Sequence, residues 1–173
     1  MRVVAFSCVH WMSRELQLSV YEYEEPLDYE LFRRLCQTLL AAPPDVVVNL
    51  GDFTETYWEQ PPTMLEEYAA LQTATRVVKL RGNHDPSDGE DCIVLDGVRY
   101  EHGHKLVPAR PGADASVENY IARLRENTAS EQRLVHGHSH VPFEGPPLDV
   151  GSVTFSGTYG EIVDGVSRLV AID

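Results

Sequence analysis

Cysteine is scarce in this sequence of 173 residues, which contains only Cys8, Cys36 and Cys92, far apart in the chain. Since there is no CxxC pair and no even set of cysteines, no disulfide framework is expected, as is typical of a reducing compartment. Long hydrophobic runs are also missing, so we expect neither a secretory leader nor a membrane-spanning segment. These absences predict a cytoplasmic protein with no membrane partner.

Positive charge is scarce as well. The sequence has 14 basic and 27 acidic residues, a net charge of −13. Such a surface repels phosphate backbones, which argues against nonspecific nucleic-acid binding. A hydrophobic content of 43%, with no low-complexity segment, repeat or linker, predicts one globular domain over residues 1–173. The composition leaves monomer and homodimer open.

Hydrophobic periodicity predicts strands that alternate with helices in the first half of the chain and a tail rich in strands. Apolar positions at helical spacing predict helices over 28–41, 63–74 and 115–127. Short apolar runs predict strands at 2–7, 45–50, 76–80, 133–135 and 151–157. Two Asp-Gly pairs, at 96–97 and 164–165, predict hairpins. This order predicts a layered α/β sandwich with parallel and antiparallel pairing.

Each of the seven histidines follows a predicted strand within a few residues: His10, His84, His102, His104, His136, His138 and His140. The carboxyl ends of strands are where sites assemble in open α/β sheets, and Asp52, Asn83 and Asp85 follow strands too. One such histidine would be an ordinary surface or core residue. Seven of them beside oxygen donors favour a polynuclear metal site. A glycine adjoins the candidate ligands at four positions: Gly51, Gly82, Gly103 and Gly137.

These loops read CVH, GD, GNHD, HGH and HGHSH in chain order. The order resembles the signature DxH, GD, GNH[DE], HG, GHxH of the calcineurin-like metallophosphoesterases. The compact length is similar to the small bacterial and archaeal phosphodiesterases of that superfamily, which carry no cap domain. The resemblance implies a four-layer αββα sandwich with mixed sheets and a dinuclear metal centre at one edge.

Carried over by motif position, the resemblance also implies the metal ligands. The first ion would be held by Cys8, His10, Asp52 and His140. The second would be held by Asp52, Asn83, His102 and His138, so that Asp52 bridges the two. Such ligands suit zinc, iron or manganese, with nickel or cobalt as alternatives. Two ions of this kind activate a bridging hydroxide as the nucleophile that attacks phosphorus.

For His84, the histidine of GNHD, the resemblance implies a role as general acid on the leaving oxygen or as a phosphate contact. Such a histidine needs an orienting carboxylate. We favour Glu55, three residues after Asp52, over the sequence neighbour Asp85. The remaining candidates for substrate contact are His104, Asn83 and Arg81.

Cys8 stands where the family pattern has its first aspartate. As a thiolate it would keep the negative charge, bind at ~2.3 Å rather than the ~2.0–2.2 Å of a carboxylate oxygen, and favour zinc or iron. The alternative is a small buried residue without a metal. We favour the ligand because a thiol beside two cations should ionise.

The GD loop, GDFTET, carries no arginine that could clamp a dianionic monoester. A monoanionic diester needs less positive charge, so a phosphodiesterase acting on a small phosphate ester is expected. Two alternatives stay open: a phosphomonoesterase of the same fold, and a non-catalytic interaction scaffold like the retromer subunit of this fold. The presence of His84 favours turnover. Aromatic residues after the ligand loops could line a substrate pocket or simply pack: Trp11, Tyr57 and Trp58.

Overall fold

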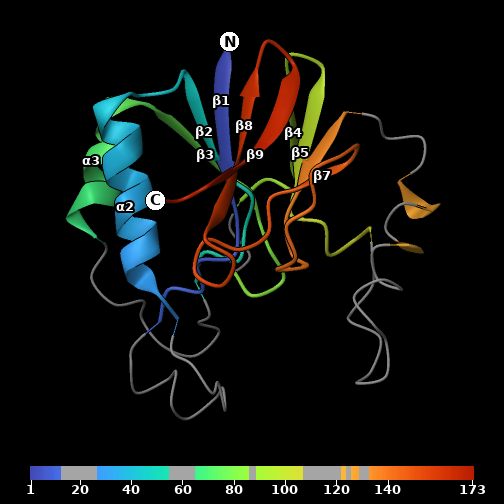
Figure 1. The fold of residues 1–173 in the computed structure, drawn as a ribbon, viewed down its shortest axis with the longest axis horizontal. Coiled ribbons are helices and arrows are strands. Elements are labelled where there is room, and N and C mark those ends of the chain that lie inside the picture. Colours follow the sequence, from blue (N-terminus) through green and yellow to red (C-terminus); the bar gives the residue numbers. More distant parts are fainter. Residues whose placement is uncertain (13–26, 55–64, 86–88, 107–121, 124–125, 129–132) are drawn as a thin grey trace.

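The computed structural model describes residues 1–12, 27–54, 65–85, 89–106, 122–123, 126–128 and 133–173. Two β-sheets pack face to face, and two helices cover the outer face of the first sheet (Figure 1). The predicted α/β sandwich with mixed sheets is therefore confirmed. Most of the helix predicted at 115–127 lies outside the described residues.

The first sheet has five strands in the order β3-β2-β1-β8-β9. Its strands are β1 (Arg2–Phe6), β2 (Val46–Asn49), β3 (Arg76–Lys79), β8 (Thr158–Val163) and β9 (Val166–Ala171). The first three are parallel, whereas β8 runs antiparallel to β1 and β9 antiparallel to β8. The final hairpin turns at Asp164-Gly165, as predicted.

The second sheet has the order β4-β5-β6-β7. Its strands are β4 (Cys92–Leu95), β5 (Val98–Glu101), β6 (Leu134–His136) and β7 (Leu148–Asp149). The hairpin predicted at Asp96-Gly97 joins the antiparallel strands β4 and β5, and the other pairs are parallel. Both sheets therefore direct several strand ends toward one edge of the sandwich.

The expectation of strand at 151–157 is wrong. These residues form turns before β8 begins. Ser156 explains the difference, because its hydroxyl donates to the Ser152 carbonyl at 2.7 Å and accepts the Ser152 amide at 2.9 Å. Local bonds of this kind compete with a strand ladder.

Helices α2 (Tyr29–Ala41) and α3 (Glu66–Ala74) confirm two of the predicted helices. The Asp28 side chain caps α2 by accepting the Glu30 amide at 3.0 Å. The buried face of α2 consists of Phe32, Leu35, Cys36 and Leu39. No helix in the described part of the chain is long and apolar enough to cross a membrane.

Strand β1 is apolar on both faces because a core lies on each side of it. Val4 and Phe6 pack toward the helices, in the cluster that holds Phe32 of α2. Val3 and Ala5 pack toward the second sheet. Continuous apolar runs are typical of strands covered on both faces. This double packing fixes the ends of β1, β2 and β3, from which the polar loops emerge.

Candidate metal centre

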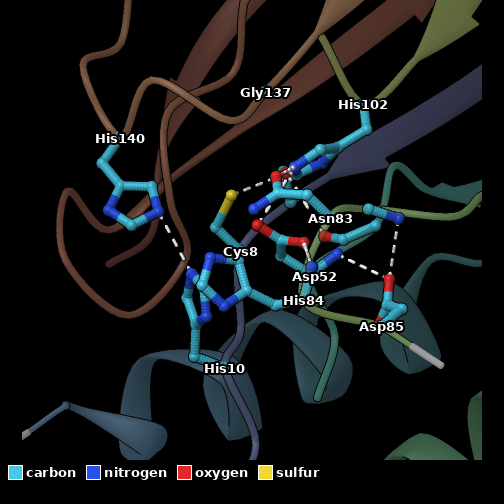
Figure 2. Close-up of polar contacts among 12 residues, drawn as sticks. Cys8, His10, Asp52, Asn83, His84, Asp85, His102, Gly137 and His140 are labelled. Atoms are coloured by element: carbon cyan, nitrogen blue, oxygen red, sulfur yellow. Dashed lines mark hydrogen bonds and ion pairs between the residues drawn. The ribbon is translucent and has the colours of Figure 1, made fainter. Parts of the chain in front are cut away.

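The loops that follow β1, β2, β3, β5 and β6 meet at one edge of the two sheets. Figure 2 shows the side chains that they bring together: Cys8, His10, Asp52, Asn83, His84, His102 and His140. His138 belongs to the same cluster, with its ring centroid 5.0 Å from that of His102. The structure thus gathers every residue that the sequence nominated as a metal ligand.

Asp85 holds the loop that carries Asp52. Its buried carboxylate accepts the backbone amides of Asp52 at 2.7 Å, Phe53 at 2.9 Å, Thr54 at 3.1 Å and Gly82 at 2.9 Å. Charge-assisted bonds to backbone amides are among the stronger hydrogen bonds in proteins. Asp85 therefore ties the GD loop to the GNHD loop and sets the position of Asp52.

Glycine is required where these two loops touch. Gly51 has φ +114°, and a Cβ there would lie 2.4 Å from the Gly82 nitrogen. A Cβ on Gly82 would lie 2.0 Å from Asp52 Oδ1. Any larger residue would push the loops apart, so the two glycines let the backbone pack against the carboxylate.

Five of the candidate ligands have a left-handed backbone, with φ between 50° and 73°: Cys8, His10, Asp52, His138 and His140. A non-glycine residue in a sparsely populated region costs of order 1–3 kcal/mol and persists where its surroundings impose it. Here the Cys8 amide donates to Gly51 O at 3.0 Å and the His10 amide to Asp52 O at 3.0 Å. Strain of this kind clusters at functional sites, and nothing in the sequence revealed it.

The first group of donors is Cys8, His10 and His140, whose ligand atoms all lie within 4.8 Å of one another. The Nε2 atoms of His10 and His140 are 3.1 Å apart. Two nitrogens held at ~2.0–2.1 Å by one tetrahedral ion would lie about 3.3 Å apart. The facing imidazoles and the sulfur therefore fit a transition-metal ion.

The second group is Cys8, Asp52 and His102, again within 4.8 Å. His102 Nε2 lies 3.0 Å from Asp52 Oδ2 and 3.2 Å from Asn83 Oδ1. Burial would raise the pKa of Asp52, but the hydrogen bond from His102 and the nearby His10 hold it well below its usual range. A charged carboxylate beside an imidazole and an amide oxygen is a second donor set suited to a divalent ion.

Among the described residues, His138 contacts His102 of the second donor group but belongs to neither of the two groups. Burial, and then the neighbouring His102, lower the pKa of His138 to about 3. It is therefore neutral near pH 7, which is the form of histidine that binds metals.

Cys8 is completely buried. Burial, and then the Asp52 carboxylate, raise the pKa of its thiol well above the usual range, although the Ser7 hydroxyl 3.0 Å away opposes this. Without a nearby cation Cys8 therefore stays protonated. A thiolate at this position requires positive charge beside the sulfur.

The other candidates lie around the cluster. His84 is half-buried; its ring meets that of His10 edge-on at 5.3 Å, and its amide donates to Asp52 Oδ1 at 2.8 Å. His104 is also half-buried, with its ring 5.4 Å from that of His102.

Glu55 lies outside the described residues, as do Tyr57 and Trp58. Trp11 is buried and packs on Tyr29 at 4.6 Å, which supports the packing interpretation.

Arg81 forms an ion pair with Asp91. Lys105, which follows the HGH motif, binds the other oxygen of the same carboxylate at 2.8 Å. The two basic side chains adjoining the site loops thus share one acidic partner, which offsets part of their charge.

The sequence motifs did not indicate two features of the site, the position of Phe155 and the hydrogen bond between Ser139 and Asp149. Phe155, from the turn before β8, is 40% exposed and stacks on His140 with ring centroids 4.8 Å apart. Ser139 donates to the buried carboxylate of Asp149 and accepts the Val141 amide at 2.9 Å. This pair anchors the turn between His138 and His140. Phe155 could have been noticed only as an apolar residue in a Ser- and Thr-rich turn.

Comparison with known proteins agrees with this architecture. Residues 1–138 match the family model described as calcineurin-like phosphoesterase. Among solved structures, the chain is similar to YfcE, a phosphoesterase from E. coli, with 18% identity over 100% of both chains and a TM-score of 0.53. It is also similar to Chaetomium thermophilum Vps29, with 14% identity over 98% of this chain and 93% of that one and a TM-score of 0.52. No curated protein matches the sequence.

Proposed function

This chain belongs to the calcineurin-like phosphoesterase family, and we propose that it is a phosphodiesterase that works with two metal ions. The observation that carries the proposal is the pair of donor groups at the carboxyl ends of the strands, each within 4.8 Å. When bound, two ions would supply Lewis acidity toward the phosphoryl oxygens and activation of water near neutral pH. The first would be held by Cys8, His10, Asp52 and His140, and the second by Asp52, Asn83, His102 and His138.

His84 is proposed as the general acid. It is half-buried at the edge of the cluster, and its backbone amide donates to Asp52 Oδ1 at 2.8 Å. Protonation of the leaving oxygen by a positioned histidine typically contributes 10²–10⁴-fold to the rate. We keep Glu55 as the proposed orienting carboxylate. Asp85 acts instead as a positioning residue, since its oxygens accept four backbone amides.

The preference for a diester is supported by the charge around the site. Arg81 and Lys105 both bind the Asp91 carboxylate, which offsets part of the positive charge that they would present to a substrate. A monoester dianion needs more positive charge for binding than a diester monoanion. His104 and Asn83 are proposed as further substrate contacts.

The test is turnover by the full chain of bis(p-nitrophenyl) phosphate and of p-nitrophenyl phosphate with manganese, zinc, iron, cobalt and nickel in turn. We expect faster cleavage of the diester, with Asp52→Asn as the inactive control. Faster cleavage of the monoester would identify a phosphomonoesterase. A folded, metal-loaded chain with no turnover on either substrate would support an interaction scaffold.

A further inference from the structure

The two donor groups share one residue. Cys8 Sγ lies within 4.8 Å of the donor atoms of His10 and His140, and within the same distance of those of Asp52 and His102. Asp52 belongs to the second group alone. In Figure 2 the sulfur lies between the two sets. We propose that the Cys8 sulfur bridges the two metal ions, an inference that rests on the two-ion site of the proposed function.

A thiolate can take this position for geometric reasons. A sulfur ligand binds transition metals at ~2.3 Å, and paired ions lie ~3.5–4 Å apart. One sulfur can therefore contact both ions. The thiol proton leaves to solvent as the sulfur–metal bonds form, so that one negative charge is shared by two cations.

The backbone of Cys8 is held on both sides. Its amide donates to Gly51 O at 3.0 Å, and its carbonyl accepts Ser152 Oγ at 2.8 Å and Thr154 Oγ1 at 3.2 Å. With these bonds in place, Cys8 has a left-handed φ of 56°. A ligand fixed before the metal arrives loses little freedom on binding.

The surroundings of Cys8 differ from those of an inert thiol. It is fully buried, yet it belongs to neither hydrophobic core cluster. A structural cysteine packs among apolar side chains. Cys8 instead faces histidines and a carboxylate, which are metal donors.

X-ray absorption at the zinc edge tests the bridge, because it counts the sulfur neighbours of each ion in the two-zinc protein. A bridging Cys8 gives one sulfur per zinc, whereas a ligand to one ion gives one half and a non-ligand gives none. We expect one sulfur per zinc in the wild type and in Cys36→Ala, and none in Cys8→Asp. A count of one half or zero in the wild type would overturn the bridge.

Zinc titration provides an independent test with His140→Ala as the matched variant. Removal of a shared ligand should weaken both binding steps by more than about tenfold, whereas loss of His140 should weaken one. Circular dichroism checks that Cys8→Ala and Cys8→Asp are folded. Weakening of a single step in Cys8→Ala would overturn the bridge.

Neither readout uses turnover, so the two proposals can fail separately. A wild type that has one sulfur per zinc in its two-zinc form but is inactive with all five metals would overturn the phosphodiesterase and support the bridge. A folded wild type that binds none of the five metals would overturn both.

Discussion

Cys8 and Cys36 are both buried, yet they lie in regions of opposite character. Cys36 lies on the inner face of α2, in the apolar cluster with Phe32 and Leu35, where burial raises the pKa of its thiol to about 12. Cys8 lies in a strained loop among imidazoles and a carboxylate. Burial raises both pKa values, so burial alone does not distinguish a structural thiol from a ligand. The neighbouring side chains make that distinction.

The largest expected effect is a loss of catalytic rate without a loss of bound metal. His84→Ala should lower kcat about 10²–10⁴-fold, because the leaving oxygen loses its proton donor. The bound metal should be unchanged, since the His84 side chain is outside both donor groups. Steady-state kinetics with metal analysis checks both statements. An equal loss of metal and activity would make His84 a ligand and contradict the assigned role.

The sequence predicted most of this cluster because chemistry-bearing residues follow strands at motif spacing. GD, GNHD and HGHSH led to Asp52, Asn83 and His140. The motifs could not reveal which donor atoms come close in space, such as the position of the Cys8 sulfur beside both donor groups. The hydrogen bond between Ser139 and Asp149 could not be predicted from the sequence either, because it depends on how β6 and β7 align.

The second prediction tests whether the loop that carries Asp52 depends on the Asp85 carboxylate for its position. Asp85→Asn replaces an oxygen acceptor by an amide group that faces backbone N–H donors, leaving some of them unsatisfied. We expect a loss of about 3 kcal/mol in the free energy of unfolding, measured by urea denaturation, together with weaker metal binding. Asp91→Asn, at the exposed Arg81 and Lys105 pair, is the control and should change the stability far less. Equal effects of the two variants would contradict the positioning role of Asp85.

The third prediction contrasts the two cysteines directly. Cys36→Ala leaves a small cavity in the apolar core and should cost about 1–2 kcal/mol with or without zinc. Cys8→Ala should instead reduce the rise in Tm that zinc produces, because ligand binding stabilises the folded state in proportion to affinity. Thermal melts over a zinc series measure both. If zinc raises the Tm of Cys8→Ala as much as that of Cys36→Ala, the predicted difference between the two cysteines is wrong.

The smallest expected effect comes from a charged network on the first sheet, outside both donor groups. Glu161 on β8 binds Arg2 at 2.8 Å and also Arg168, and these hydrogen bonds lower the pKa of its carboxyl. A carboxyl whose folded pKa is lowered adds stability above its unfolded pKa and loses it as the pH falls through the folded value. Glu161→Gln should therefore cost about 1 kcal/mol at pH 7, because Arg168 is largely exposed, and almost nothing at pH 2. Urea denaturation at the two pH values measures the difference. Zinc should leave this difference unchanged, which distinguishes the ion pair from the metal-dependent stability of the Cys8 region.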